Sequence, residues 1–197
     1  MIKKIRKIYR ENEKDYTSKL EDMYLYYTTN ISNASMAASL KCCVFLLCLY
    51  KALEPEKILD LGSGFSSYAL RYFNGRFLPD SEIYSVDSSK GWLEKSKQFC
   101  QLNTLNDEHF YHWDEIKGKK IPFELIFMDI DFSKNRVNYY NPVCKQFLAE
   151  KTFMLADDMH KPILRNVAET LDFKERHPVL DETKHKKRYS WLLEFGR

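Results

Sequence analysis

The segment Ile58-Leu-Asp-Leu-Gly-Ser-Gly-Phe-Ser-Ser67 is the strongest indicator of the fold class. It opens with the apolar pattern of a buried β-strand that carries Asp60 near its end. Gly62 and Gly64 then allow a tight turn and a close approach of the backbone to another molecule. A helix is expected directly afterwards, near residues 66–73. A strand that passes through a glycine turn into a helix is the opening unit of a doubly wound α/β sheet.

Short apolar runs alternate with amphipathic stretches along the rest of the chain. With the first strand at residues 57–61, further strands are predicted at 82–86, 109–112, 123–128 and 152–156, and further helices near 91–103, 140–148 and 163–171. Such alternation indicates βαβ units and helices on both faces of a sheet. Residues 171–177 and 188–195 are expected to form an antiparallel strand pair, joined by a polar segment without helical periodicity. The predicted fold class is α/β, a Rossmann-like, doubly wound, mostly parallel sheet with a C-terminal antiparallel pair.

The N-terminal part is predicted to be helical. Residues 3–27 alternate charged and apolar side chains at a loosely helical spacing, and residues 34–53 form a strongly apolar helix that Pro55 ends. No repeat or linker divides the chain. We therefore expect one domain over residues 1–197, with residues 1–33 as a helical extension or lid.

The composition excludes several classes of protein. A content of 44% hydrophobic residues with only six Gly and six Pro is that of a globular protein. The formal charge of +3 is too close to balance to favour a nucleic-acid partner. The longest apolar run, residues 42–50, is about half of what a bilayer span needs, and the N-terminus lacks the apolar core of a secretory signal. With five cysteines in no paired motif, we expect a cytoplasmic protein that spans no membrane.

An acidic residue follows the second predicted strand. Asp87 ends the run Ser85-Val-Asp87 and comes 23 residues after Gly64. A carboxylate at this position can accept both hydroxyls of a ribose, which predicts a ligand that contains adenosine. Ser67 stands where the full GxGxxG motif has its last glycine, and this disfavours a nicotinamide dinucleotide.

Asp60-Leu-Gly-Ser-Gly64, Asp87 and the final strand pair resemble the class I S-adenosylmethionine-dependent methyltransferases over residues 34–197. The resemblance implies S-adenosylmethionine as the cofactor. It places Asp60 and the glycine turn at the methionine part, Asp87 at the ribose, and residues 113–114 at the adenine. The predicted cofactor-binding residues are Asp60, Gly62, Ser63, Gly64, Ser66, Asp87, Ser88, Trp113, Asp114 and Asp129.

Four carboxylates, Asp129, Asp131, Asp157 and Asp158, follow the fourth and fifth predicted strands. The carboxyl ends of parallel strands share one edge of the sheet, so these side chains should converge. Like charges so close together raise one another's pKa values unless a cation is present, and oxygen ligands suit Mg²⁺, Ca²⁺ or Mn²⁺ better than zinc. This predicts a divalent ion. The alternative for Asp157 and Asp158 is capping of the helix that begins near Pro162.

The same residues resemble the metal-dependent O-methyltransferases of the catechol and caffeoyl-CoA type and of the sugar-modifying type. The resemblance implies Asp129, Asp157 and Asp158 as ligands of Mg²⁺ or another divalent cation. Phe132 stands where the catechol enzymes have a catalytic lysine, so that base is not carried over, whereas the sugar-type Asp two residues after the first ligand matches Asp131. The predicted catalytic residues are Asp131, with His160 and Lys134 as other candidate bases.

The predicted function is methyl transfer from S-adenosylmethionine to a hydroxyl of a small-molecule acceptor, assisted by a divalent ion. A metal-independent methyltransferase, a non-catalytic S-adenosylmethionine-binding protein and a nicotinamide-dependent reductase remain alternatives. The predicted protein partner is a second copy of the chain, in a homodimer. The basic run at residues 184–188 is interpreted as a solvated turn of the final strand pair.

Overall fold

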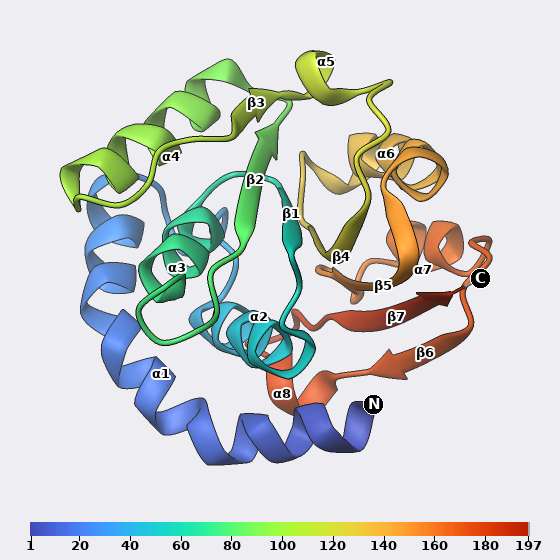
Figure 1. Ribbon diagram of the computed structural model, residues 1–197, viewed down its shortest axis with the longest axis horizontal. Helices are drawn as coiled ribbons and strands as arrows, with labels where there is room; N and C mark the ends of the chain where they lie inside the picture. The colour runs from blue at the N-terminus through green and yellow to red at the C-terminus, as the bar shows by residue number, and fades with distance from the viewer. Residues whose placement is uncertain (197) are drawn as a thin grey trace.

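The computed structural model describes residues 1–196, and they are built around a seven-stranded sheet (Figure 1). The strand order is β3-β2-β1-β4-β5-β7-β6. Strand β7 runs antiparallel to both of its neighbours, and all other pairs are parallel. This confirms the predicted α/β class and the C-terminal antiparallel pair. The strands are β1 Lys57–Leu61, β2 Glu82–Asp87, β3 Phe110–His112, β4 Phe123–Met128, β5 Leu148–Ala156, β6 Glu175–Pro178 and β7 Trp191–Gly196.

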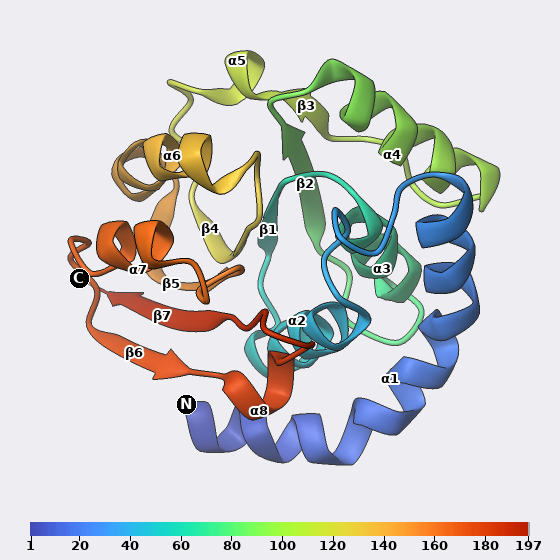
Figure 2. The same cartoon turned by 180° about the vertical axis from the view of Figure 1, so that it is seen from behind.

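Helices cover both faces of the sheet, and each layer encloses its own apolar cluster (Figures 1 and 2). Along β4, Leu125 and Phe127 enter one cluster while Ile126 and Met128 enter the other, as the two-residue period of a strand requires. The first layer consists of α1 Ile2–Asn30, α2 Leu40–Leu53, α3 Phe65–Phe73 and α4 Lys90–Leu102, the second of α6 Ser133–Gln146 and α7 Pro162–Ala168, and two short helices are α5 Trp113–Ile116 and α8 Leu180–Thr183.

Helix α1 runs along the outside of the molecule, past α2 and α3 (Figure 1). It buries one side chain every few residues, from Ile5 through Tyr16 to Tyr27, and this fixes it against the core along its whole length. Residues 2–30 thus form a helical extension that is packed on the core. The alternative prediction, that residues 1–33 act as a lid, stays a prediction. No helix within residues 1–196 is long and apolar enough to cross a membrane.

One difference from the sequence prediction concerns the start of α2. The apolar composition predicted a helix from residue 34, but α2 begins at Leu40, because the Ser39 hydroxyl accepts a hydrogen bond from the Cys42 N–H at 3.1 Å and caps it there. Residues 31–39 instead form a loop, which we call the roof loop. This loop matters for the site described below.

Other boundaries differ as well. Helix α6 begins at Ser133 instead of residue 140, because its first half is polar and shows no apolar period, and β5 begins at Leu148 instead of residue 152. Helix α7 ends at Ala168, three residues early. The segment between β6 and β7, for which no helix was expected, contains α8.

Candidate functional site

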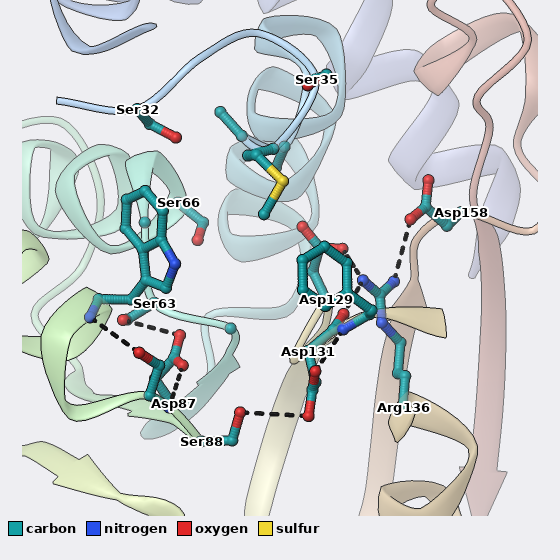
Figure 3. A pocket seen from close by; sticks show the side chains of 18 of the residues that line it. Ser32, Ser35, Ser63, Ser66, Asp87, Ser88, Asp129, Asp131, Arg136 and Asp158 are labelled. Atoms are coloured by element: carbon teal, nitrogen blue, oxygen red, sulfur yellow. Dashed lines mark hydrogen bonds and ion pairs between the residues drawn. The ribbon is translucent and has the colours of Figure 1, made fainter. Parts of the chain in front are cut away.

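A pocket of about 350 Å³ opens at the carboxyl ends of the central strands. It lies where the strand order reverses between β1 and β4, the position at which open α/β sheets bind their ligands. The loops after β1, β2, β4 and β5 line one side, and the roof loop lies across from them (Figure 3). The predicted residues that the structure brings together here are Gly62, Ser63, Gly64, Ser66, Asp87, Ser88, Asp129, Asp131 and Asp158.

The turn after β1 packs directly against the end of β4. Gly62 has a φ of 102°, and a Cβ there would lie 2.5 Å from the carbonyl carbon of Asp129. In the same contact between the two segments, the Asp129 N–H donates a hydrogen bond to the Leu61 carbonyl at 2.7 Å. Only glycine combines this backbone angle with this clearance, so the glycine turn fixes where Asp129 enters the pocket.

Asp60 is fully buried and does not line the pocket. Its carboxylate accepts hydrogen bonds from the hydroxyls of Ser66 at 2.8 Å, Ser67 at 2.5 Å and Ser85 at 3.1 Å. Burial raises the pKa of Asp60, and these hydroxyls oppose the increase. The carboxylate therefore ties β1, β2 and the start of α3 together, and its predicted contact with a methionine group is not supported by this geometry.

Asp87 lies at the end of β2 with its carboxylate in the pocket. The Ser89 N–H donates to one oxygen at 2.8 Å, and the Ser63 hydroxyl donates to the other at 3.1 Å (Figure 3). Burial raises the pKa of Asp87 while these two bonds lower it. The side chain is thus held rigidly beside the glycine turn, as the predicted ribose contact requires.

The two residues predicted at the adenine lie elsewhere. Trp113 packs edge-on against Tyr139 and Phe147, and Asp114 is exposed and forms an ion pair with Lys117. Neither lines the pocket. Trp92, in the first turn of α4, lines it instead.

The three predicted metal ligands, Asp129, Asp157 and Asp158, form what we call the acid cluster, and each is paired with a cationic side chain. Arg136 lies 2.8 Å from Asp129 and 3.6 Å from Asp158. Arg188 lies 3.0 Å from Asp157 and 3.1 Å from Asp158. Lys161 completes the set at 2.7 Å from Asp158. Three carboxylates therefore meet three cations.

These pairings do not fit the predicted metal site. Three ligands of one ion must gather closely, yet among residues 1–196 the group whose ligand atoms all lie within 4.8 Å of one another is Glu175, His177 and Glu194, on β6 and β7. Burial raises the pKa of Asp129, and the neighbouring guanidinium opposes the increase. Burial also acts to raise the pKa of Asp158, but the cations around it, Arg188 first, lower it. The acid cluster is neutralised by the chain's own side chains.

Of the three candidate bases, Asp131 alone lines the pocket among the described residues. It has a φ of 60°, an uncommon conformation for a residue other than glycine, and its carboxylate accepts from its neighbour's N–H at 2.6 Å. The Nδ1 atom of His160 lies 3.6 Å from Asp158, outside the pocket lining, and burial lowers the pKa of His160. Lys134 is exposed on α6.

Sequence reasoning missed the roof loop and the cations. The basic run at residues 184–188 was interpreted as a solvated turn, but the Arg188 side chain is only 18% exposed because its ion pairs draw it inward. Sequence proximity to Asp87 could have indicated Ser89 and Trp92, which follow it by two and five residues. The missed pocket residues are Ser32, Ser35, Met36, Ala37, Ala38, Ser89, Trp92, Phe132, Arg136, Lys161 and Arg188.

No protein-family model matches the sequence, and a search of curated proteins finds no match. Solved structures do resemble it. The O-methyltransferase from Bacillus cereus in complex with SAH (S-adenosylhomocysteine) is 17% identical, with a TM-score of 0.67 over 91% of each chain. The SAH-bound methyltransferase PaMTH1 from Podospora anserina is 16% identical, with a TM-score of 0.68 over 90% of this chain and 87% of that one.

A third solved structure is the O-methyltransferase TomG from Streptomyces achromogenes, involved in tomaymycin synthesis and in complex with SAM (S-adenosylmethionine). It is 17% identical, with a TM-score of 0.58 over 83% of this chain and 82% of that one. The chain has the fold of the class I S-adenosylmethionine-dependent methyltransferases. At these identities the likeness establishes the architecture of the sheet and leaves the chemistry of the pocket to its residues.

Proposed function

We propose that the chain transfers a methyl group from S-adenosylmethionine to a hydroxyl oxygen of a small molecule. The observation that carries this proposal is the Asp87 carboxylate, held at the end of β2 beside the Gly62–Gly64 turn and facing the pocket. A buried carboxylate there can accept ribose hydroxyls, while the turn lets the backbone approach the rest of the cofactor. Trp92, which lines the same pocket, offers an apolar face for the adenine.

The reaction is an in-line displacement. The bond between the methyl carbon and the sulfonium sulfur breaks as the bond to the acceptor oxygen forms, and sulfur keeps the electron pair, which leaves S-adenosylhomocysteine. The acceptor's proton goes to the carboxylate of Asp131, the candidate base that lines the pocket. The remaining contribution of the chain is to align the two reactants and to exclude water.

The acceptor is expected to contact the apolar residues of the lining. Met36 and Ala37 of the roof loop line the pocket, and so does Phe132, which is 65% exposed and follows Asp131 directly. Such a lining suits an apolar or aromatic body that carries the reacting hydroxyl. The divalent ion predicted from the sequence is not part of this proposal, because the acid cluster is already paired with cations.

Calorimetric titration with S-adenosylmethionine, S-adenosylhomocysteine and NADH tests the proposal. We expect both adenosyl compounds to bind and NADH not to bind. Binding of NADH alone would favour the reductase. Binding of S-adenosylmethionine without methyl transfer to any member of a panel of phenols, sugars and hydroxy acids, followed with a radiolabelled methyl group, would favour a non-catalytic binding protein. The expected cytoplasmic location and homodimer remain predictions.

A further inference from the structure

Two arginines occupy the space between the carboxylates of the acid cluster. Figure 3 shows the Arg136 guanidinium between Asp129 and Asp158, with an ion pair to each. Arg188 bridges Asp158 and Asp157 in the same way. The two arginines therefore link all three carboxylates into one alternating chain of charges.

Both guanidinium groups are held by further bonds, so they are not free side chains that could swing aside. Arg136 is 4% exposed, and it donates to the carbonyl of Ile130 at 2.8 Å and to that of Asp131 at 2.9 Å. Arg188 donates to the carbonyl of Ala37 at 3.0 Å. Moving either group away would leave backbone carbonyls and a buried carboxylate without partners, and such a loss is strongly destabilising.

We propose that Arg136 and Arg188 take the place of the divalent ion, so that the site is metal-independent. An ion such as Mg²⁺ needs ligand oxygens about 2.1 Å away in a nearly octahedral arrangement, whereas here guanidinium nitrogens separate the oxygens. A further double positive charge beside two guanidinium groups would also be repelled. The consequence for catalysis rests on the proposed methyl transfer, but the metal-binding statement does not.

The arginines would then perform the structural part of an ion's role without its Lewis acidity. Arginine stays protonated at any working pH, so neither residue can accept the acceptor's proton. Arg136 fixes the backbone of Asp131 through the bond to its carbonyl, and Arg188 fastens the roof loop to the acid cluster. Proton removal is left to Asp131.

Mn²⁺ titration followed by electron paramagnetic resonance tests this inference without an acceptor. The His177→Ala protein is used, because Glu175, His177 and Glu194 form a separate candidate site on β6 and β7. We expect no saturable Mn²⁺ binding up to about 1 mM, the weak end of the range for oxygen-ligand cation sites. Saturable binding that Asp158→Asn weakens would overturn the inference. S-adenosylhomocysteine binding, measured on the same sample, reports separately on the proposed function.

A second arm uses the loss of one arginine. In His177→Ala/Arg188→Met, Asp157 and Asp158 lose a cation, so Mn²⁺ should bind there and raise the thermal midpoint of this variant but not that of His177→Ala alone. Equal responses of the two proteins to Mn²⁺ would contradict the exchange of arginine for an ion. If the variant does not fold at all, the titration of His177→Ala still decides.

Discussion

The guanidinium of Arg188 lies 3.0 Å from a carboxylate oxygen of Asp157, whose side chain is 3% exposed. Arg188 precedes β7 and Asp157 follows β5, so this pair joins two segments 31 residues apart at the carboxyl end of the sheet. A further bond from Arg188 to the carbonyl of Ala37 extends the connection to the roof loop. The Arg188 side chain thus connects the loop after β5 to the roof loop.

Replacing Arg188 with methionine should lower the free energy of unfolding by about 3 kcal/mol, because a buried carboxylate loses its cation. Urea unfolding followed by circular dichroism measures the change. Lys187→Met is the matched control, since Lys187 is exposed and should change stability by no more than about 0.5 kcal/mol. A loss for Arg188→Met no larger than that of the control would show that the ion pair contributes little.

Gly62→Ala should destabilise the fold more than Gly118→Ala does. Both glycines have a positive φ, 102° and 88° respectively, so an alanine is strained at either position. At Gly62 the new Cβ would also lie 2.5 Å from the Asp129 backbone, whereas nothing lies within 4 Å at Gly118. The difference in unfolding free energy between the two variants isolates the clash, which we expect to be about 1–3 kcal/mol. Equal losses would argue against the close packing of the turn on β4.

Tryptophan fluorescence separates the two candidates for the adenine contact. Trp92 lines the pocket, while Trp113 packs against Tyr139 and Phe147 away from it. Addition of S-adenosylhomocysteine should change the emission of the unaltered protein and of Trp113→Phe, and the change should be largely lost in Trp92→Phe. The opposite outcome would restore the adenine contact that the sequence predicted at Trp113.

The fold was accessible from the sequence because each of its main signals is local. The Ile58–Ser67 stretch combines an apolar strand, a glycine turn and a helix, and β1 and β4 begin and end where the apolar runs do. The predicted start of α2 was wrong for a different reason, although the signal there is also local. Composition alone favoured a helix from residue 34, and the decisive feature is one Ser39 cap that composition does not weigh.

Only part of the candidate site could be predicted from the sequence. Residues at strand ends, such as Asp87 and Asp131, could be placed because parallel strands deliver their carboxyl ends to one edge. Arg136 and Arg188 could not, because a helix and a distant turn bring them there and neither lies at the end of a parallel strand. Counting carboxylates without these cations led to an ion that the charges of the folded chain do not require.

Asp87→Ala should weaken S-adenosylmethionine binding about ten- to a hundredfold, since hydrogen bonds to a charged group contribute about 1.5–3 kcal/mol. Calorimetry measures the affinity. Asp114→Ala is the control, because Asp114 is exposed and lies outside the pocket, and its affinity should equal that of the unaltered protein. A loss of affinity confined to Asp114→Ala would instead place the nucleoside at α5, which contains Asp114.

The identity of the base can be decided by comparing Asp131→Asn with His160→Gln, once an acceptor is found. Asp131 lines the pocket, and its carboxylate also accepts from the Ser88 hydroxyl at 3.4 Å, so it faces the space between the strand ends (Figure 3). His160 is held near Asp158 instead. Removal of a general base costs about 10²–10⁴-fold in rate. Asp131→Asn should show this loss, and His160→Gln should be nearly silent.

The pH dependence distinguishes a lost base from a merely disturbed pocket. As pH rises, the acceptor hydroxyl ionises unaided and needs the base less, so the defect of Asp131→Asn should shrink. A disturbed pocket would instead lower the rate by a similar factor at every pH and weaken S-adenosylhomocysteine binding. Parallel pH–rate profiles of both variants, with their S-adenosylhomocysteine affinities as the control, make the measurement. A pH-dependent defect in His160→Gln together with a silent Asp131→Asn would move the base to His160 and require the side chain to turn into the pocket when the acceptor binds.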